Sequence, residues 1–164
     1  MPKFGYSITG IDPDKTAKAS GRDLRVSPKA AREVCNAIRN MPLDKAKQYL
    51  ENVIAKKTMV PFRHHKKKQA HHGGLHKWYA GRYPVKAASG ILKILRNAEN
   101  IAEYKGLDAD NLRIIHATTQ RGRKIKKYIP RAFGRSSAYF EQWVHIEIVL
   151  SEEEEALEFE EEGS

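Results

Sequence analysis

Two segments of strand-forming residues enclose a long basic stretch near the C-terminal end of this 164-residue chain, and their pairing is the strongest constraint on the fold. Residues 112–119 are rich in β-forming side chains, and residues 144–150 carry apolar side chains at alternate positions. If the segments pair as a hairpin, each arm has about 20 residues and spans ~65 Å, at ~3.3 Å per residue. A compact domain of this size has a radius of gyration of only ~14 Å. Most of the hairpin is therefore expected to project from the domain.

The stretch that joins the two segments is basic and aromatic. Residues 111–140 contain no acid and eight bases, which are Arg113, Arg121, Arg123, Lys124, Lys126, Lys127, Arg131 and Arg135. Lysine and arginine neutralise phosphates, and aromatic rings such as those of Tyr128 and Phe133 stack on unpaired bases. An isolated two-stranded ribbon is marginally stable in water, so a partner is needed to hold it. This composition predicts that the partner is nucleic acid.

The charge of the whole chain agrees with a polyanionic partner. The net charge is +10, but eight of the 20 acids lie in the last 14 residues, so residues 1–150 carry 30 bases against 12 acids. A body with a net charge of +18 repels itself unless a polyanion, either nucleic acid or an anionic membrane surface, neutralises it. The single cysteine excludes a disulfide framework, and the absence of a long apolar run or an apolar leader favours a cytoplasmic protein with no membrane partner.

Three helices are expected, over residues 28–40, 43–56 and 84–105, from apolar side chains at helical spacing. Ser27 and Pro28 form a favourable start for the first helix, with the Ser27 hydroxyl able to accept a capping hydrogen bond, and Gly106 is a plausible end for the third. We expect residues 1–22 to be an arm with at most one strand, residues 23–150 to form a single domain, and residues 151–164 to be a disordered acidic tail.

Residues 57–83 break every periodicity and contain no acid. Long irregular loops in small domains are functional or disordered, and the mixture of bases with Trp78, Tyr79 and Tyr83 favours a loop embedded in RNA. The loop also holds a histidine cluster, formed by His64, His65, His71, His72 and His76. Because the loop offers no cysteine or carboxylate and its cations repel a metal ion, we expect no metal there.

Catalysis finds little support in the sequence. Cys35 lies on the apolar stripe of the first helix, where a buried thiol is expected, and the Glu99–Glu103 pair on the third helix fits a solvated face. No glycine-rich phosphate loop is present. We therefore expect neither an enzyme nor a cofactor. The two helices joined at Met41 and Pro42 leave a DNA-binding helix-turn-helix as a lesser alternative.

Four segments in order resemble the universal large-subunit ribosomal protein twenty-two family, in the branch with an archaeal or eukaryotic-type insertion. They are residues 25–32 (first helix), 95–100 (third helix), 128–135 (hairpin tip) and 145–149 (returning strand). The resemblance implies an α+β fold, in which a small three-helix domain packs on a short antiparallel sheet and carries a long protruding β-hairpin. It implies a structural constituent of the large ribosomal subunit that binds rRNA and lines the nascent-peptide exit tunnel. The loop at residues 57–83 departs from the shorter bacterial pattern.

These arguments together give candidate functional residues. The expected rRNA-binding residues are Arg22, Arg25, Arg63, Lys66, Lys67, Lys68, Trp78, Arg82, Lys86, Arg121, Arg123, Lys124, Lys126, Lys127 and Tyr128. The residues that match the tip, and are expected at the tunnel wall, are Arg131, Ala132, Phe133, Gly134 and Arg135. The expected partners are large-subunit rRNA, neighbouring ribosomal proteins and the nascent polypeptide, on cytoplasmic ribosomes. Two alternatives are a free nucleic-acid-binding regulator and a metal-dependent enzyme built on the histidine cluster.

Overall fold

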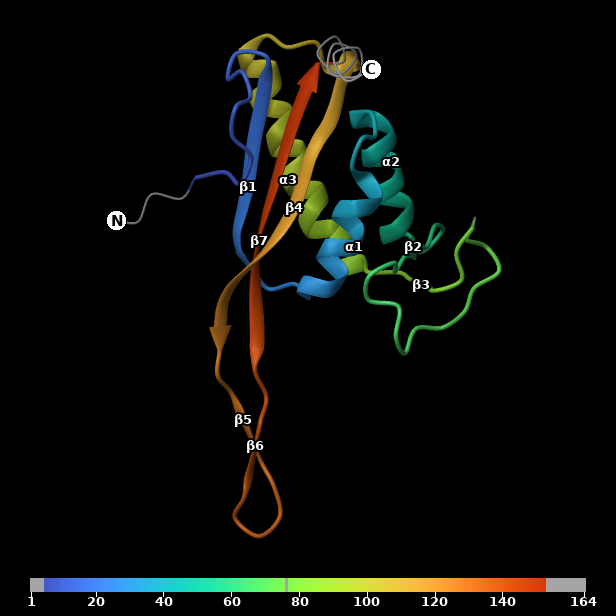
Figure 1. Cartoon of the computed structure of the whole chain (residues 1–164), viewed down its shortest axis with the longest axis vertical. Coiled ribbons are helices and arrows are strands. Elements are labelled where there is room, and N and C mark those ends of the chain that lie inside the picture. Colours follow the sequence, from blue (N-terminus) through green and yellow to red (C-terminus); the bar gives the residue numbers. More distant parts are fainter. Residues whose placement is uncertain (1–4, 76, 153–164) are drawn as a thin grey trace.

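The computed structural model describes residues 5–75 and 77–152 and has the expected α+β architecture. Within these residues, three α-helices pack on a three-stranded antiparallel sheet, from which a two-stranded ribbon projects (Figure 1). The elements in chain order are β1 (Thr16–Leu24), α1 (Pro28–Ile38), α2 (Leu43–Ile54), β2 (Val60–Pro61), β3 (Gly81–Arg82), α3 (Val85–Lys105), a 3-10 turn (Ala109–Asn111), β4 (Leu112–Ile125), β5 (Tyr128–Pro130), β6 (Ser136–Ala138) and β7 (Glu141–Glu152).

Strand β7 lies at the centre of the main sheet, in the order β1-β7-β4, and is antiparallel to both neighbours. The alternate apolar side chains of β7 are fully buried, as the strand pattern predicts; they are Val144, Ile146, Ile148 and Leu150. Glu147 and Val149, which alternate with them, are buried as well. Both faces of the central strand are therefore covered along this stretch.

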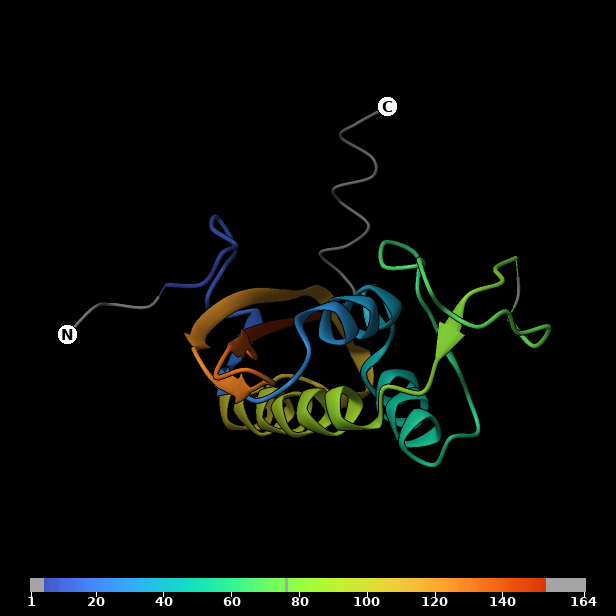
Figure 2. The ribbon, with the colours of Figure 1, turned by 90° about the horizontal axis from the view of Figure 1, so that it is seen from below.

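The three helices bury the apolar stripes predicted from the sequence. Helix α3 packs against β1 and β7, α1 packs against β4, and α2 packs against α3. In Figure 2, α3 runs along one face of the sheet while α1 and α2 lie toward β4. Ala31, Val34, Cys35 and Ile38 of α1 are all in the hydrophobic core. Only part of the α2 stripe is fully buried, because Ile54 near its end is half-exposed.

The helix ends show small corrections. α1 and α2 end at Ile38 and Ile54, two residues before the predicted ends at residues 40 and 56. Ser27 stands at the N-cap of α1 as predicted, but its hydroxyl makes no capping hydrogen bond, and its carbonyl oxygen accepts the Ala31 N–H instead. The fixed φ of Pro28 at the first helical position suffices to start the helix there. Gly106 ends α3 as predicted, with a φ of 76° in the left-handed region that favours glycine.

The predicted hairpin is present and projects from the domain (Figure 1). β4 and β7 pair from Leu112 opposite Glu152 to Ile125 opposite Glu141, and β5 and β6 continue the ribbon outward. Every residue from 126 to 140 is exposed to solvent, because no further layer covers this part of the ribbon. The two arms of the hairpin therefore extend beyond the domain, as predicted from an arm length that exceeds the radius of gyration of the domain.

Residues 57–83 form an irregular excursion between α2 and α3, as predicted. Within it, β2 pairs with β3, and an isolated bridge joins His71 to Ala80. Residues 16–22 of the expected N-terminal arm belong to β1, which begins at Thr16 and pairs with β7 as an edge strand of the main sheet. Ser151 and Glu152 complete β7, whereas residues 153–164 of the expected acidic tail lie outside the described residues. The division into arm, domain and tail stays a prediction.

Candidate nucleic-acid interface

The loop at residues 57–83 is fastened to α1 by a buried carboxylate. Glu33 lies in the middle of α1 with its side chain 1% exposed. One of its oxygens accepts the backbone N–H of Arg63 at 3.0 Å, and the other accepts those of His64 (3.0 Å) and His65 (2.9 Å). Phe62 beside them is buried in the core. This anchor holds a basic segment against the helix although the segment has no regular structure.

Within the loop, the rings of Trp78 and Tyr79 form an aromatic group, and two cations lie close to the Trp78 ring. The rings of Trp78 and Tyr79 stack at 5.3 Å between centroids, and the indole N–H of Trp78 donates to the Phe62 carbonyl at 3.0 Å. Arg63 and Lys66 both lie about 6 Å from the Trp78 ring centroid. Tyr79 is exposed, so its ring faces solvent, whereas the two cations lie at the ring of Trp78 that stacks on it. This combination suits a stacked nucleobase with its phosphate nearby.

The hairpin is fixed at its base by Glu141, the first residue of β7. One oxygen of its carboxylate accepts a hydrogen bond from Arg25, which precedes α1, and the other accepts one from Lys127 at 2.8 Å. The hydrogen bonds from Lys127 and Arg25 hold the pKa of the Glu141 carboxyl below its ordinary value. A second acid, Glu147, pairs with Arg22 at 3.4 Å in the buried face of β7.

Beyond Glu141 the ribbon presents bases and rings to solvent. Lys124 lies 4.4 Å from the centroid of the Phe140 ring, and the ring of Tyr128 meets Phe140 edge-on at 5.9 Å. At the tip, Phe133 is 94% exposed with a φ of 58°, and Gly134 follows with a φ of 66°. Two consecutive positive φ angles form the tight turn that reverses the ribbon. The tip therefore displays a phenyl ring, with Arg131 and Arg135 beside it.

Comparison with known proteins identifies the family. The family model for ribosomal protein L22p/L17e matches residues 19–151, which include the sheet, all three helices, the loop and the hairpin. The chain belongs to this ribosomal protein family. The family resemblance inferred from the four sequence segments is thus confirmed, and the match extends over nearly the whole described chain.

Curated relatives of the L22p/L17e family are similar to this chain over almost their full length. The large ribosomal subunit protein uL22 of Archaeoglobus fulgidus is 50% identical over 149 residues, covering 91% of this chain and 96% of the relative. The uL22 protein of Methanocaldococcus jannaschii is 51% identical (93% and 97% covered), and that of Methanopyrus kandleri is 52% identical (93% and 99% covered). The similarity to archaeal relatives agrees with the branch indicated by the sequence.

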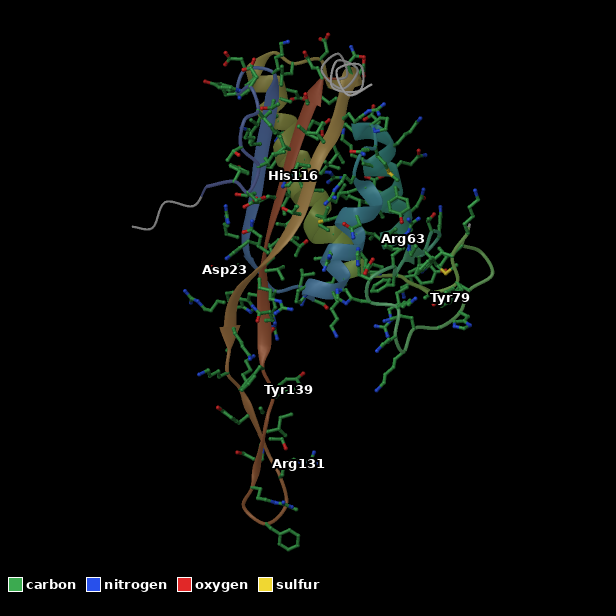
Figure 3. The ribbon with its side chains drawn as sticks, viewed as in Figure 1. Asp23, Arg63, Tyr79, His116, Arg131 and Tyr139 are labelled. Carbon is green, nitrogen blue, oxygen red and sulfur yellow. The ribbon has the colours of Figure 1, made fainter. Side chains whose placement is uncertain are left out.

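In this L22p/L17e protein the candidate rRNA-binding residues form two separate groups. Arg63 and Tyr79 lie at the loop, whereas Arg131 and Tyr139 lie far along the hairpin (Figure 3). The loop group contains Arg63, Lys66, Lys67, Lys68, Trp78 and Arg82, together with Lys86 in the first turn of α3. The hairpin group contains Arg121, Arg123, Lys124, Lys126, Lys127 and Tyr128. Arg22 and Arg25 lie at the hairpin base, where both are engaged by carboxylates.

The sequence arguments missed the acids that organise this interface. Glu33, Glu141 and Glu147 each bind a group from a distant part of the chain. Glu33 is marked in the sequence only as the single acid of α1, and Glu141 and Glu147, which share β7 with Glu152, carry no such mark. Gly122 lies in the β4 bulge, where a Cβ atom would come within 2.9 Å of the His145 ring.

The histidine cluster, Cys35 and Glu99 were considered above for metal binding or catalysis, and the structure shows what surrounds them. Among residues 5–75 and 77–152, no group of three or more His, Cys, Asp or Glu side chains is placed to hold a metal ion; His76 lies outside this range. Cys35 is buried as expected, and burial raises the pKa of its thiol to about 11, against smaller opposing effects of Thr119 and Arg39. Glu99 accepts a hydrogen bond from Lys47. Within the described part of the chain, no helix is both long and apolar enough to cross a membrane.

Proposed function

We propose that this protein is a structural constituent of the large ribosomal subunit, that it binds large-subunit rRNA, and that its hairpin tip lines the nascent-peptide exit tunnel. The observation that carries the proposal is the ribbon itself, in which every residue from 126 to 140 is exposed and which lies in a stretch of 30 residues without an acid. A two-stranded ribbon without a covering layer is marginally stable in water, and its cations are placed to gain stability from surrounding RNA. Membership of a ribosomal protein family supports the same role.

Each candidate group has a distinct task in this proposal. The lysines and arginines of β4 and of the segment that follows it neutralise rRNA phosphates along this one arm of the ribbon. The aromatic group of Trp78 and Tyr79 stacks with an unpaired base beside the loop. Arg22 and Arg25 position the hairpin through their carboxylate partners, and any N–H groups left over can reach phosphates. Neighbouring ribosomal proteins share the site in the cytoplasmic ribosome. The role is structural, and it requires no cofactor.

Hairpin truncation tests the rRNA-binding part of the proposal. A variant in which Asn-Gly replaces residues 128–138 retains the Lys127–Tyr139 backbone pair, whose hydrogen bond measures 2.7 Å, and closes it with a favourable two-residue turn. It lacks Arg131 and Arg135, so the slope of log affinity for large-subunit rRNA against log salt should fall by up to about 2. The matched control, Lys45→Gln with Arg96→Gln, removes the same charge from exposed helix positions.

The control should leave the slope and affinity nearly unchanged. Equal behaviour of the truncation and the control would contradict an rRNA contact at the hairpin tip, since the bases from Arg121 to Lys127 are kept in the truncated variant. Sedimentation of a cell lysate tests assembly directly, because the protein should be recovered with the large subunit. Recovery only in light fractions would overturn the proposal and favour a free nucleic-acid-binding regulator.

A photocrosslinking experiment tests the tunnel contact separately. Phe133→benzoylphenylalanine places the reactive group at the tip, and Tyr104→benzoylphenylalanine places it on α3 at a similar exposure, 93% against 94%. On ribosomes stalled with a radiolabelled nascent chain, we expect crosslinks to that chain from position 133 and not from position 104. Crosslinks from position 133 to rRNA alone would reject the tunnel-lining role while leaving rRNA binding intact.

A further inference from the structure

A polar cleft lies between α1 and β4, apart from the loop and hairpin groups described above. Its volume is about 370 Å³, and it is lined by Arg32, Cys35, Asn36, Arg39, His64, Ala117, Thr118 and Thr119. Two guanidinium groups, an amide, an imidazole and two hydroxyls thus surround one space, and no carboxylate is among the lining residues. None of the α1 or β4 residues in this set was among the candidates drawn from the sequence.

The helix and the strand explain why these groups converge. Arg32, Asn36 and Arg39 follow the i, i+4, i+7 spacing that places side chains on one face of a helix. Arg39, just past the end of the helix, donates through Nη2 to the carbonyl oxygen of Ala117 at 2.9 Å. That bond fixes the guanidinium against β4, and a guanidinium has further N–H donors for a ligand.

The floor and the rim of the cleft are also fixed. The Cys35 sulfur lies 3.3 Å from the Thr119 hydroxyl, which ties the helix to the strand beneath the cleft. His64 belongs to the loop, and its backbone N–H is held by Glu33 at 3.0 Å. Glu33 itself is buried, with both oxygens occupied by backbone N–H groups, and it does not line the cleft. The cleft therefore keeps its positive charge in a pre-formed shape.

We propose that this cleft binds one phosphate group of an RNA backbone. Paired guanidinium groups match the oxygens of a phosphodiester, and neutral hydroxyl and amide donors complete the set of contacts. The cleft lies where the loop meets β4, the strand that continues into the hairpin, so an RNA strand crossing it would connect the two candidate groups. This inference rests on the proposed rRNA binding and adds a third contact point, which reads no base sequence.

The first test compares two single-charge variants of the full chain for affinity to large-subunit rRNA. Arg32→Gln removes a cleft charge from an exposed residue, and Lys45→Gln removes the same charge from an exposed position on α2 that lines no described cleft. Loss of one phosphate contact should weaken binding about eightfold at ~0.1 M salt and reduce the salt slope by ~0.9, or ~0.7 for a single-stranded site. Equal affinities and slopes for the two variants would overturn the inference.

The second test does not depend on rRNA binding. Dimethyl phosphate, a minimal phosphodiester, is titrated into the isotope-labelled wild-type chain while the side-chain amide of Asn36 is followed by NMR. We expect saturable shifts of that amide, and at least a fivefold weaker response in Arg32→Gln. Absence of shifts, or shifts caused by an oligoglutamate peptide but not by dimethyl phosphate, would overturn the cleft proposal. Failure of wild-type rRNA binding with intact dimethyl phosphate shifts would instead contradict the proposed function.

Discussion

Replacing Glu33 with glutamine should release the loop at residues 57–83 from the domain. The carboxylate accepts three backbone hydrogen bonds of 2.9–3.0 Å in a site that is 1% exposed. In Glu33→Gln, the remaining oxygen can still accept from His64 and His65, but the new NH₂ group faces the N–H of Arg63. The side-chain NH₂ group and the backbone N–H of Arg63 are then two hydrogen-bond donors that face each other in a buried site without an acceptor.

The cost follows from the number and kind of these bonds. Hydrogen bonds to neutral acceptors are about half as strong as those to charged ones, so the two retained bonds lose ~1 kcal/mol each. The buried and unsatisfied N–H of Arg63 adds ~1–3 kcal/mol. The sum is about 4 kcal/mol, a large part of the ~5–15 kcal/mol that stabilises a typical domain. Because the loop can detach while the core stays folded, the loss should be mainly local.

Amide hydrogen exchange measures this local loss. A change of about 4 kcal/mol corresponds to roughly a thousandfold faster exchange of the amides of residues 63–65, with little change for buried amides of β7. Glu103→Gln on the exposed side of α3 is the matched control, since it makes the same charge change at a solvated position. Acceleration of less than about tenfold in Glu33→Gln, or equal acceleration in both variants, would refute the assignment of Glu33 as the anchor.

Two further predictions concern the hairpin. Phe133→Asn should stabilise the tip by about 1 kcal/mol, because asparagine tolerates the φ of 58° better than phenylalanine and the exposed ring packs on nothing in the described chain. Slower hydrogen exchange of the Arg135 amide would show this stabilisation, and faster exchange would count against it. Lys127 and Arg25 lower the pKa of Glu141 in the folded state. The contribution of the Glu141 carboxylate to folding stability is therefore complete above the ordinary carboxyl pKa and is lost as pH falls through the lower, folded-state pKa. A carboxyl NMR titration should therefore give a midpoint below 4.5 that rises in Lys127→Gln, and an unchanged midpoint would exclude the Lys127 bond.

Local patterns in the sequence predicted the elements well because those patterns have local causes. The apolar spacing of α1 and α3 reflects burial along one face, and Gly106 ends α3 because glycine adopts a positive φ at little cost. The local errors were small: α1 and α2 end two residues earlier than predicted, and the Ser27 hydroxyl makes no capping hydrogen bond. Hairpin projection was also predictable, since it follows from arm length and domain size.

The contacts within the candidate interface were beyond the reach of such patterns. Arg25 and its partner Glu141 are 116 residues apart in the chain, and Arg22 and Glu147 are 125 apart. No spacing rule connects residues so distant, and each arginine by itself is indistinguishable from a free phosphate-binding cation. The same holds for Glu33, whose partners are backbone N–H groups of an irregular loop.

The sequence alone predicted a small helical domain, a projecting basic ribbon and a polyanionic partner, because periodicity, length and charge are properties of the chain itself. Tertiary structure alone decided which cations are already paired, where Trp78 and Tyr79 stack, and that Arg32 and Arg39 face β4 across a cleft. The physical reason is that electrostatic partners and clefts arise between elements distant in sequence. Only packing brings those elements to within a few ångströms.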